Sequence, residues 1–224
     1  MIVTSSIPVK TLERLLLYRW TLKNYLDPEN THIVSRRLSE ITGFSPAQIR
    51  RDFMSIGYSG SSAHGYKIKD LINAIDKAIC PHSAQNIAVA GIGQLGKAVI
   101  NYIQGRSTLL KIKAAFDNDP EKINKVFHGV RTYHTDEIEK IIRKEDISMA
   151  ILALPPANAQ EIAMNLVNAG VKAFLNYSPI KLNLPEHVYI ENRDMLLAVE
   201  KIAYFARSLK KGTDENEGIS WLNS

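Results

Sequence analysis

Three glycines and one aspartate near the middle of the chain have the spacing of a dinucleotide-binding site. The apolar run 87–90 leads into Gly91, Gly93 and Gly96, a helix-like stretch follows, and a second apolar run ends at Asp117, 21 residues after the last glycine. The first glycine would allow a tight turn, the second a close approach of backbone to pyrophosphate, and the third close helix–strand packing. Phosphates would lie at the helix N-terminus, and the carboxylate would bind ribose hydroxyls and repel a 2′-phosphate. We therefore predict NAD(H) rather than NADP(H); the alternative is a tight turn in a pocket that is empty or binds another nucleotide.

The elements that would hold this site follow from the pattern of apolar residues after residue 85. Strand-like and helix-like segments alternate along this part of the chain. The expected strands are 87–90, 111–116, 148–154, 172–176 and 187–191, and the expected helices are 94–104, 119–126, 136–144 and 157–169. Such alternation predicts βαβ units and a parallel sheet, an α/β fold of the Rossmann type.

The residues before the glycines have the element order of a winged helix-turn-helix. Helices are expected from Pro8 to about Leu26, from Ser35 as N-cap to Thr42, from Pro46 to about Ile56, and from Asp70 to about Ile79. Ser45 would cap the third helix, with Gln48 three residues later in a capping box. The glycine-rich stretch 57–66 predicts a short β-hairpin, the wing. The alternative is a helical cap or oligomerisation domain with solvated arginines.

The third helix of such a unit lies in the major groove of DNA. Gln48 suits adenine and Arg51 suits guanine, and the helix face that carries them, with Asp52 and Ser55, is expected to face solvent or the groove. The other DNA-binding candidates are Ser45 and the cations Arg36, Arg37, Arg50 and Lys67, which suit phosphates. Residues 1–85 hold 11 Lys and Arg against 7 Asp and Glu, whereas residues 86–224 hold 17 against 16. The positive excess near the N-terminus favours a polyanionic partner there.

The segment 195–207, MLLAVEKIAYFAR, is apolar nearly all round. A surface helix needs an apolar stripe on one side only, so this helix is expected to be buried on most faces. Insertion between two subunits would bury it and implies a homodimer. The alternative is burial within its own chain.

Composition and motif content exclude several classes. One cysteine, Cys80, excludes an intrachain disulfide and a cysteine-built zinc site. Because it has no evident activating partner, we expect it to be a small buried hydrophobe. No apolar run approaches the roughly 18–20 residues of a membrane span, and the N-terminus is not a secretory signal, so a cytoplasmic protein is expected. The six histidines are scattered and form no catalytic or metal-binding pattern.

The chain also has little room for a catalytic apparatus. The dinucleotide fold and one helix use nearly all of residues 86–224, which leaves no substrate domain. We therefore expect a sensor and no enzyme. Two alternatives stay open: a small NAD-dependent oxidoreductase with an N-terminal oligomerisation domain, and a DNA-binding or structural protein whose Rossmann domain no longer binds nucleotide.

Over about residues 7–207 the chain resembles the Rex family of redox-sensing transcriptional repressors. The resemblance is carried by IPVKTLERLLLYRWTLKNYL, SPAQIRRDF, GIGQLGKAVINY, FDNDPEK and AGVKAFLNYSPIKLNLPEHVYIENRDMLLAV. It implies a winged helix that binds a palindromic operator, a Rossmann domain that binds NAD(H), and a C-terminal helix exchanged between the subunits of a homodimer. It further implies that NADH closes the dimer and releases DNA, while NAD+ permits DNA binding.

The resemblance also implies roles for particular residues. The cofactor-binding set would be Gly91, Ile92, Gly93, Gln94, Leu95, Gly96, Tyr102, Asp117, Asn118, Lys122, Leu154, Pro155, Asn176, Ser178 and Pro179. Arg19 and Asp194 would form an ion pair that couples the DNA domain to the nucleotide domain. The wing sequence 61–66, SSAHGY, departs from the family because it lacks a permanent cation, and His64 would be charged there only when protonated.

These inferences divide the chain into four segments. Residues 1–82 are expected to form the winged-helix domain and residues 83–192 the Rossmann domain. Residues 193–211 would form the exchanged helix, and residues 212–224 a flexible tail.

Overall fold

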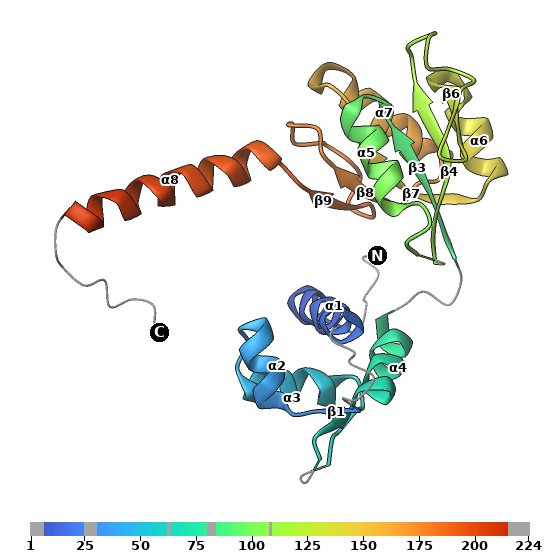
Figure 1. Cartoon of the computed structure of the whole chain (residues 1–224). Helices are drawn as coiled ribbons and strands as arrows, with labels where there is room; N and C mark the ends of the chain where they lie inside the picture. Colours follow the sequence, from blue (N-terminus) through green and yellow to red (C-terminus); the bar gives the residue numbers. More distant parts are fainter. Residues whose placement is uncertain (1–6, 25–30, 62–63, 80–83, 108, 215–224) are drawn as a thin grey trace. The chain divides into compact units, whose positions relative to one another are not determined.

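The chain divides into two units, Met1–His82 and Ser83–Ser224, and each is described by itself. The computed structural model describes residues 7–24, 31–61, 64–79, 84–107 and 109–214, with side chains up to 207 (Figure 1). Cys80, the linker at 81–83 and the wing residues 62–63 lie outside the described residues, as does the segment 215–224.

The N-terminal unit packs its helices around one apolar core. Its elements are α1 Val9–Asn24, β1 His32–Ile33, α2 Ser35–Thr42, α3 Pro46–Ser55, β2 Tyr66–Lys67 and α4 Ile68–Ile79. Each helix contributes fully buried side chains, among them Leu15, Leu38, Phe53 and Leu71. Tyr18 of α1 meets the ring of Phe53 of α3 edge to face, with ring centroids 5.4 Å apart. This core fixes α3 against α1.

Local signals explain how α2 and α3 begin and end. Gly43 ends α2 in the left-handed region at φ 76°, and its N–H donates to the Ser39 carbonyl. The Ser45 hydroxyl accepts a hydrogen bond from the N–H of Gln48 and so caps α3 as predicted. The reciprocal half of the predicted capping box was wrong, because the Gln48 side chain bonds to Asp52 and Arg51 instead. The predicted cap of α2 was wrong: Val34 is the N-cap and Ser35 is the first helical residue.

The wing forms the expected hairpin and also leads into a strand pairing that the sequence did not predict. Ser61 and Gly65 exchange two backbone hydrogen bonds of 2.8 and 2.9 Å, which agrees with the expected hairpin. The chain then leaves this turn as β2 and pairs antiparallel with β1, a strand of two residues before α2. An element this short carries no periodic signal.

The C-terminal unit is a seven-stranded sheet in the order β5-β6-β4-β3-β7-β8-β9, with β5 antiparallel and its other strands parallel. Its strands are β3 Gln85–Ala90, β4 Leu110–Asp117, β5 Val126–Phe127, β6 Val130–His134, β7 Ile147–Leu152, β8 Ala173–Asn176 and β9 Tyr189–Asn192. Its helices are α5 Gln94–Ile103, η1 Thr135–Glu137, α6 Ile138–Lys144, α7 Pro156–Ala169 and α8 Met195–Asp214. Leaving β5 aside, the parallel strands have the order 3-2-1-4-5-6 of a Rossmann fold.

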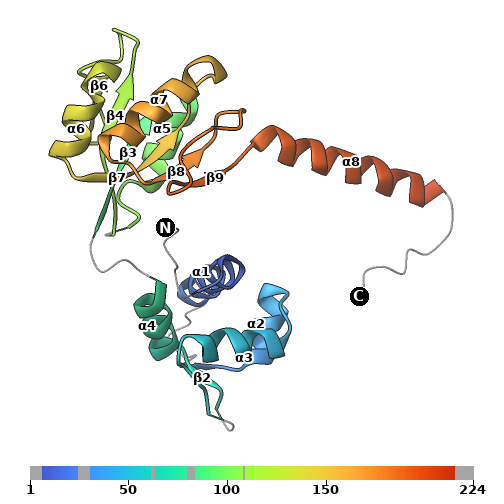
Figure 2. The same cartoon turned by 180° about the vertical axis from the view of Figure 1, so that it is seen from behind.

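Helices cover both faces of the sheet (Figure 1, and Figure 2 from behind). Ile87 and Val89 of β3 point into the cluster that contains α5, whereas Ala88 and Ala90 point into the cluster that contains α6 and α7. The central strand is therefore apolar on both sides, which is why its sequence reads as a continuous hydrophobic run.

The helix predicted at 119–126 is wrong. Residues 120–124 form turns, and the chain continues into the β5–β6 hairpin. His128 and Gly129 connect these strands with φ values of 47° and 79°, as a type I′ turn requires. Polar turn residues and Pro120 outweighed the apolar spacing that had indicated a helix.

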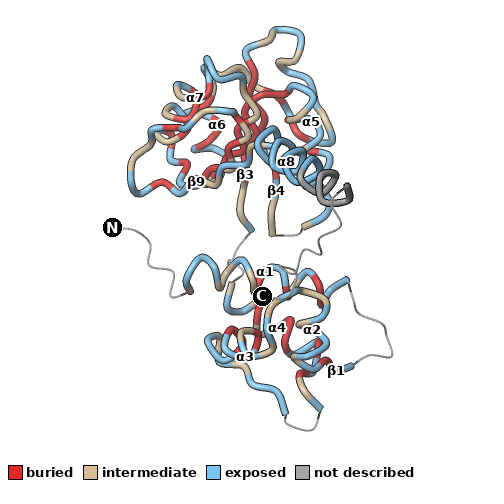
Figure 3. The backbone as a smooth tube through the Cα atoms, turned by 90° about the vertical axis from the view of Figure 1, so that its left-hand side faces the viewer, coloured by how far each residue is buried: buried red, intermediate tan, exposed pale blue. Residues whose placement is uncertain are grey.

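Helix α8 is exposed along its described side chains, residues 195–207 (Figure 3). Leu197, Ile202 and Tyr204 are 63%, 67% and 68% exposed. Burial within its own chain, the alternative considered from the sequence, is therefore wrong. The helix continues to Asp214 and includes the first residues of the expected tail. Over the described ranges, no helix has the length and apolar character required to cross a membrane.

Candidate functional site

The loops that carry the predicted nucleotide site meet at the carboxyl edge of the sheet. Backbone bonds continue past the strand ends: Gly91 donates to Phe116 at 2.8 Å, Ala153 to Ala90 at 2.8 Å, and Tyr177 to Leu152 at 2.9 Å. The segments after β3, β4, β7 and β8 are thereby held side by side. In open α/β sheets, ligands bind at this edge where the strand order reverses.

The three glycines of the loop after β3 do different work. Gly91 has φ 91°, and a Cβ there would collide with the Ala153 carbonyl oxygen. A Cβ at Gly96 would collide with the carbonyl oxygen of Gly91. Gly93, the exposed N-cap of α5, is different: apart from its chain neighbours, no atom in the described part of the protein lies within 4 Å of where its Cβ would stand. The fold itself requires Gly91 and Gly96, whereas Gly93 leaves open space at a helix N-terminus.

Asp117, at the end of β4, lies against this loop and is only 6% exposed. Its Oδ2 accepts from the Ile92 N–H at 2.8 Å, and its Oδ1 accepts from the Asp119 N–H at 3.0 Å. The ammonium of Lys122 lies 3.3 Å from Asp117 and 3.2 Å from Asp119. Burial opposes the charge of Lys122, but these two carboxylates outweigh it and raise the pKa of the ammonium. A carboxylate, Asp117, and an ammonium group, Lys122, thus lie beside the glycine loop.

Beyond β8, the segment Asn176–Pro179 offers a polar group without a partner. The Asn176 side chain is fully used: it donates to the Ile180 carbonyl and to Asn192, and it accepts from the Ser178 N–H. Ser178 is 5% exposed, and its hydroxyl has no hydrogen-bond partner among the described residues. A buried hydroxyl of this kind usually has a partner, so a ligand at this edge would supply one.

The remaining predicted cofactor residues differ in position. Leu95 and Leu154 are half-buried, and the exposed members are Gln94, Asn118, Pro155 and Pro179. Tyr102 does not reach this edge from its own helix, because α5 begins at the edge and Tyr102 is next to its last residue. Its ring is 64% exposed, with the Arg106 guanidinium 4.3 Å from the ring centroid.

In the N-terminal unit, α3 exposes cations and buries an acid. Arg50 and Arg51 are exposed, and Arg50 also donates to the Ser35 hydroxyl at 3.1 Å. Asp52 is only 3% exposed, so the expectation that it faces solvent or a groove is wrong. The reason is an internal partner: Arg14 of α1 donates to both carboxylate oxygens at 2.7 Å. The sequence contained a signal, since Asp52 lies within the apolar spacing of Ile49, Phe53 and Ile56.

The contacts around Asp52 shift its own pKa and that of Tyr18. Burial alone would raise its pKa, but hydrogen bonds from Arg14, Gln48 and Tyr18 outweigh that effect, and the pKa lies below its usual value. The pKa of Tyr18 is raised well above its ordinary value, first by burial and then by the charge of Asp52. At neutral pH, Asp52 and Arg14 are therefore both ionised, and the Tyr18 hydroxyl stays protonated.

Most of the other predicted DNA contacts and coupling residues already have partners in their own unit. Lys67 pairs with Asp70 at 3.2 Å. Arg19 pairs with Asp76 at 3.0 Å. Asp194 caps α8 by accepting from the N–H groups of Leu196 and Leu197. Arg36 and Ser45 are exposed, and Arg37 pairs with Glu40 at 2.9 Å.

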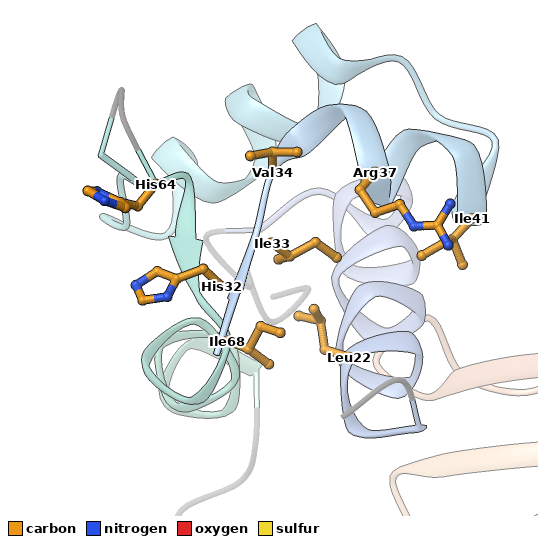
Figure 4. A pocket seen from close by; sticks show the side chains of 8 residues that line it. All are labelled: Leu22, His32, Ile33, Val34, Arg37, Ile41, His64 and Ile68. Carbon is orange, nitrogen blue, oxygen red and sulfur yellow. The ribbon is translucent and has the colours of Figure 1, made fainter. Parts of the chain in front are cut away.

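Beside the wing, the N-terminal unit has a cavity of about 290 Å³ (Figure 4). His32 and His64 line it with ring centroids 6.1 Å apart, and Leu22, Ile33, Ile41 and Ile68 contribute apolar side chains to its lining. Of the predicted DNA contacts, only Arg37 lines it. No group of three metal-ligating side chains occurs in the described residues.

The fold combines two units. A winged-helix unit is typical of DNA-binding proteins, and a Rossmann unit is typical of nucleotide-binding proteins. Residues 6–53 match the family described as "Putative DNA-binding protein N-terminus", and residues 82–180 match the "CoA binding domain" family. A redox-sensing transcriptional repressor Rex of Syntrophobacter fumaroxidans is 34% identical over 89% of this chain and 96% of its own length. Its counterpart in Geobacillus sp. (strain WCH70) is 37% identical over 89% and 92%. The chain belongs to the Rex family of redox-sensing transcriptional repressors.

Solved structures agree with this assignment. RSP, a Rex-family repressor, in complex with β-NAD+ and operator DNA superimposes with a TM-score of 0.83 at 30% identity, covering 94% of this chain and 99% of RSP. RSP in complex with β-NADH superimposes with a TM-score of 0.81 at 29% identity, covering 93% and 98%. These relatives are repressors by name.

Proposed function

We propose that this protein is a cytoplasmic, homodimeric repressor that binds palindromic operator DNA and releases it when NADH binds. It would thereby report the ratio of NADH to NAD+. The observation that carries the proposal is the open N-terminus of α5 at Gly93, beside the buried Asp117, in a chain that also holds a helix-turn-helix. RSP, solved with β-NAD+ and operator DNA and with β-NADH, supports it.

The residues at the carboxyl edge fit NAD(H). The loop from Gly91 to Gly96 would hold the pyrophosphate through backbone N–H groups, and Asp117 would accept from the ribose hydroxyls of the adenosine end. The carboxylate would repel a 2′-phosphate, and Lys122 would lie beside the adenosine. The unpartnered hydroxyl of Ser178 would face the nicotinamide side, together with Leu154 and Pro155. The oxidation state of the nicotinamide supplies the signal.

The preference for the reduced coenzyme would come from charge. NAD+ carries a positive charge on its nicotinamide ring and NADH does not, so an apolar, closed surrounding disfavours the oxidised form. Closure would come from the dimer, and α8 supplies the surface for it, because seven large apolar side chains between Met195 and Phe205 are exposed in the single chain.

DNA would be bound by α3 of each subunit. Arg51, exposed near the centre of α3, is the candidate base reader, and Arg36, Arg50, Ser45 and Lys67 would position the helix on the phosphates. Two such helices related by a two-fold axis would require half-sites of fixed separation. NADH would release the DNA by changing that separation.

The test is a gel mobility shift with a duplex that the native chain itself enriches from a random library. We expect release by micromolar NADH, and little release by NAD+, NADPH or CoA. Release by NADPH or CoA as strong as by NADH would contradict the NAD(H) assignment. Indifference to every nucleotide would favour a Rossmann domain without a ligand, and oxidation of NADH with some substrate would favour the oxidoreductase.

A further inference from the structure

Gln48 is half-buried in a chain of hydrogen bonds that runs from α1 to the exposed face of α3. Its Nε2 donates to Asp52 Oδ1 at 2.8 Å, and its Oε1 accepts from Arg51 at 3.0 Å. Both ends of the amide are therefore engaged within the protein. A glutamine that reads adenine needs the same two atoms for the base.

The orientation of this amide is fixed by chemistry. The carboxylate of Asp52 only accepts hydrogen bonds and the guanidinium of Arg51 only donates them. Turning the amide over would place its oxygen against the carboxylate and its NH₂ against the guanidinium, and both bonds would be lost. Gln48 therefore links the two side chains, so that the place of the Asp52 carboxylate determines where the Arg51 guanidinium is held.

Asp52 is itself held from the side of α1. Its two oxygens accept from four donors: two nitrogens of Arg14 at 2.7 Å, the Tyr18 hydroxyl at 3.0 Å, and Gln48. Arg14 also donates to the Thr11 hydroxyl at 3.1 Å. Since charge-assisted, bidentate bonds of this kind are strong and directional, Asp52 is a rigid anchor.

We infer that Gln48 is a positioning residue, and that the base specificity of α3 is set by Arg51 held through Gln48, Asp52 and Arg14. This arrangement, which we call the α1–α3 relay, rests on the proposed DNA-binding function. It replaces the expectation that Gln48 reads adenine directly. An arginine held in one orientation loses less side-chain freedom when it binds a base, so the relay would sharpen discrimination.

The relay makes a prediction about which base position responds. If Gln48 reads a base, Gln48→Ala removes discrimination at a position different from the one that Arg51→Ala affects. If Gln48 positions Arg51, both variants lose discrimination at the same position. Asp52→Asn would do the same more weakly, because an amide cannot serve both Arg14 and Gln48 as an acceptor.

The experiment measures the affinity of the full chain for the duplex enriched by the native protein and for each of its single-base substitutions. At the Arg51 position we expect about tenfold weaker discrimination in Gln48→Ala, with an unchanged salt dependence of binding to non-specific DNA. Met54→Ala, at a residue of α3 that is 69% exposed and outside the relay, is the matched control. Thermal unfolding of each variant establishes that it is folded.

Three outcomes decide the matter. Loss of discrimination at one shared position supports the relay. Loss at a separate position in Gln48→Ala, or full discrimination at every position, overturns it while the proposed repressor function stands. Failure of the native chain to enrich any duplex overturns the DNA-binding proposal, and the relay with it.

Discussion

The carboxylate of Asp117 accepts a hydrogen bond of 2.8 Å from the backbone N–H of Ile92, and both residues are buried. This bond ties the end of β4 to the glycine loop after β3. The acid that is expected to face the ribose therefore also shapes the loop that is expected to hold the pyrophosphate. Substitution of Asp117 should affect both at once.

We expect Asp117→Asn to weaken NADH binding by at least tenfold and to reduce the preference for NADH over NADPH. The change removes the negative charge that would repel a 2′-phosphate and weakens the acceptor for Ile92. Fluorescence titration with each nucleotide measures both effects. Asp119→Asn is the control, since Asp119 also pairs with Lys122, whereas the Ile92 N–H donates to Asp117. An unchanged ratio of the two affinities would contradict the role of Asp117.

Gly93→Val should abolish NADH binding and leave the protein folded. Among the described residues, no atom beyond the chain neighbours of Gly93 would meet the new Cβ, and its φ of −77° suits any residue, so the fold should accept valine. The added methyls should enter the space proposed for the pyrophosphate. Titration calorimetry with NADH and a thermal unfolding scan are the measurements. Ala98→Val, at an exposed position on the same helix, should bind NADH normally. Normal binding by Gly93→Val would show that the pyrophosphate lies elsewhere.

The exposed α8 predicts a dimer. We expect the double variant Leu197→Glu/Ile202→Glu to run as a monomer in light scattering, because burial of each large apolar side chain contributes about 1.5–3 kcal/mol to association and a carboxylate reverses that gain. Lys201→Glu, which changes a charge at a position that is already polar, should stay dimeric. A native chain that is monomeric at micromolar concentration would refute the exchange of α8.

The lowered pKa of Asp52 predicts how the stability of the N-terminal unit depends on pH. In the unfolded chain this carboxyl titrates near its ordinary pKa of about 3.9. The folded pKa is lower, so the ion pair contributes its full stability above about pH 4 and loses it as the pH falls toward the folded pKa. Native protein should therefore exceed Asp52→Asn in stability by a constant amount, about 3–5 kcal/mol, from pH 5 to 8.

Hydrogen exchange of the amides of α1 and α3 measures this difference in the full chain without interference from the Rossmann unit. The advantage of the native protein should shrink below about pH 4. A difference that stays constant down to pH 2 would mean that the Asp52 carboxylate is not stabilised by its partners.

The sequence predicted the parts of the molecule that have strong local signals. The boundaries of α2 and α3 were predicted to within one residue because Gly43, Ser45 and Pro46 determine helix ends through backbone conformation and capping. The loop from Gly91 to Gly96 and the parallel sheet were predicted for similar reasons. What failed depended on contacts between distant residues: the burial of Asp52 requires Arg14, 38 residues away, and β1 exists only because β2 pairs with it.

The α1–α3 relay also depends on contacts that the sequence does not reveal. The sequence places Gln48 and Arg51 away from the apolar face of Ile49 and Phe53; in the structure Arg51 is exposed, whereas Gln48 is half-buried. The sequence does not reveal that Gln48 turns back to Asp52 and so has no free amide. Residue type and helical spacing predict which face a side chain occupies, whereas its partners decide what it can bind.

The dissociation constant of NADH, measured with and without saturating operator duplex, reports the coupling between the two ligands. By linkage, DNA must weaken NADH binding by the same factor by which NADH weakens DNA binding. We predict a weakening of about tenfold or more that is equal in both directions. An NADH affinity that is unchanged by the duplex would contradict the account.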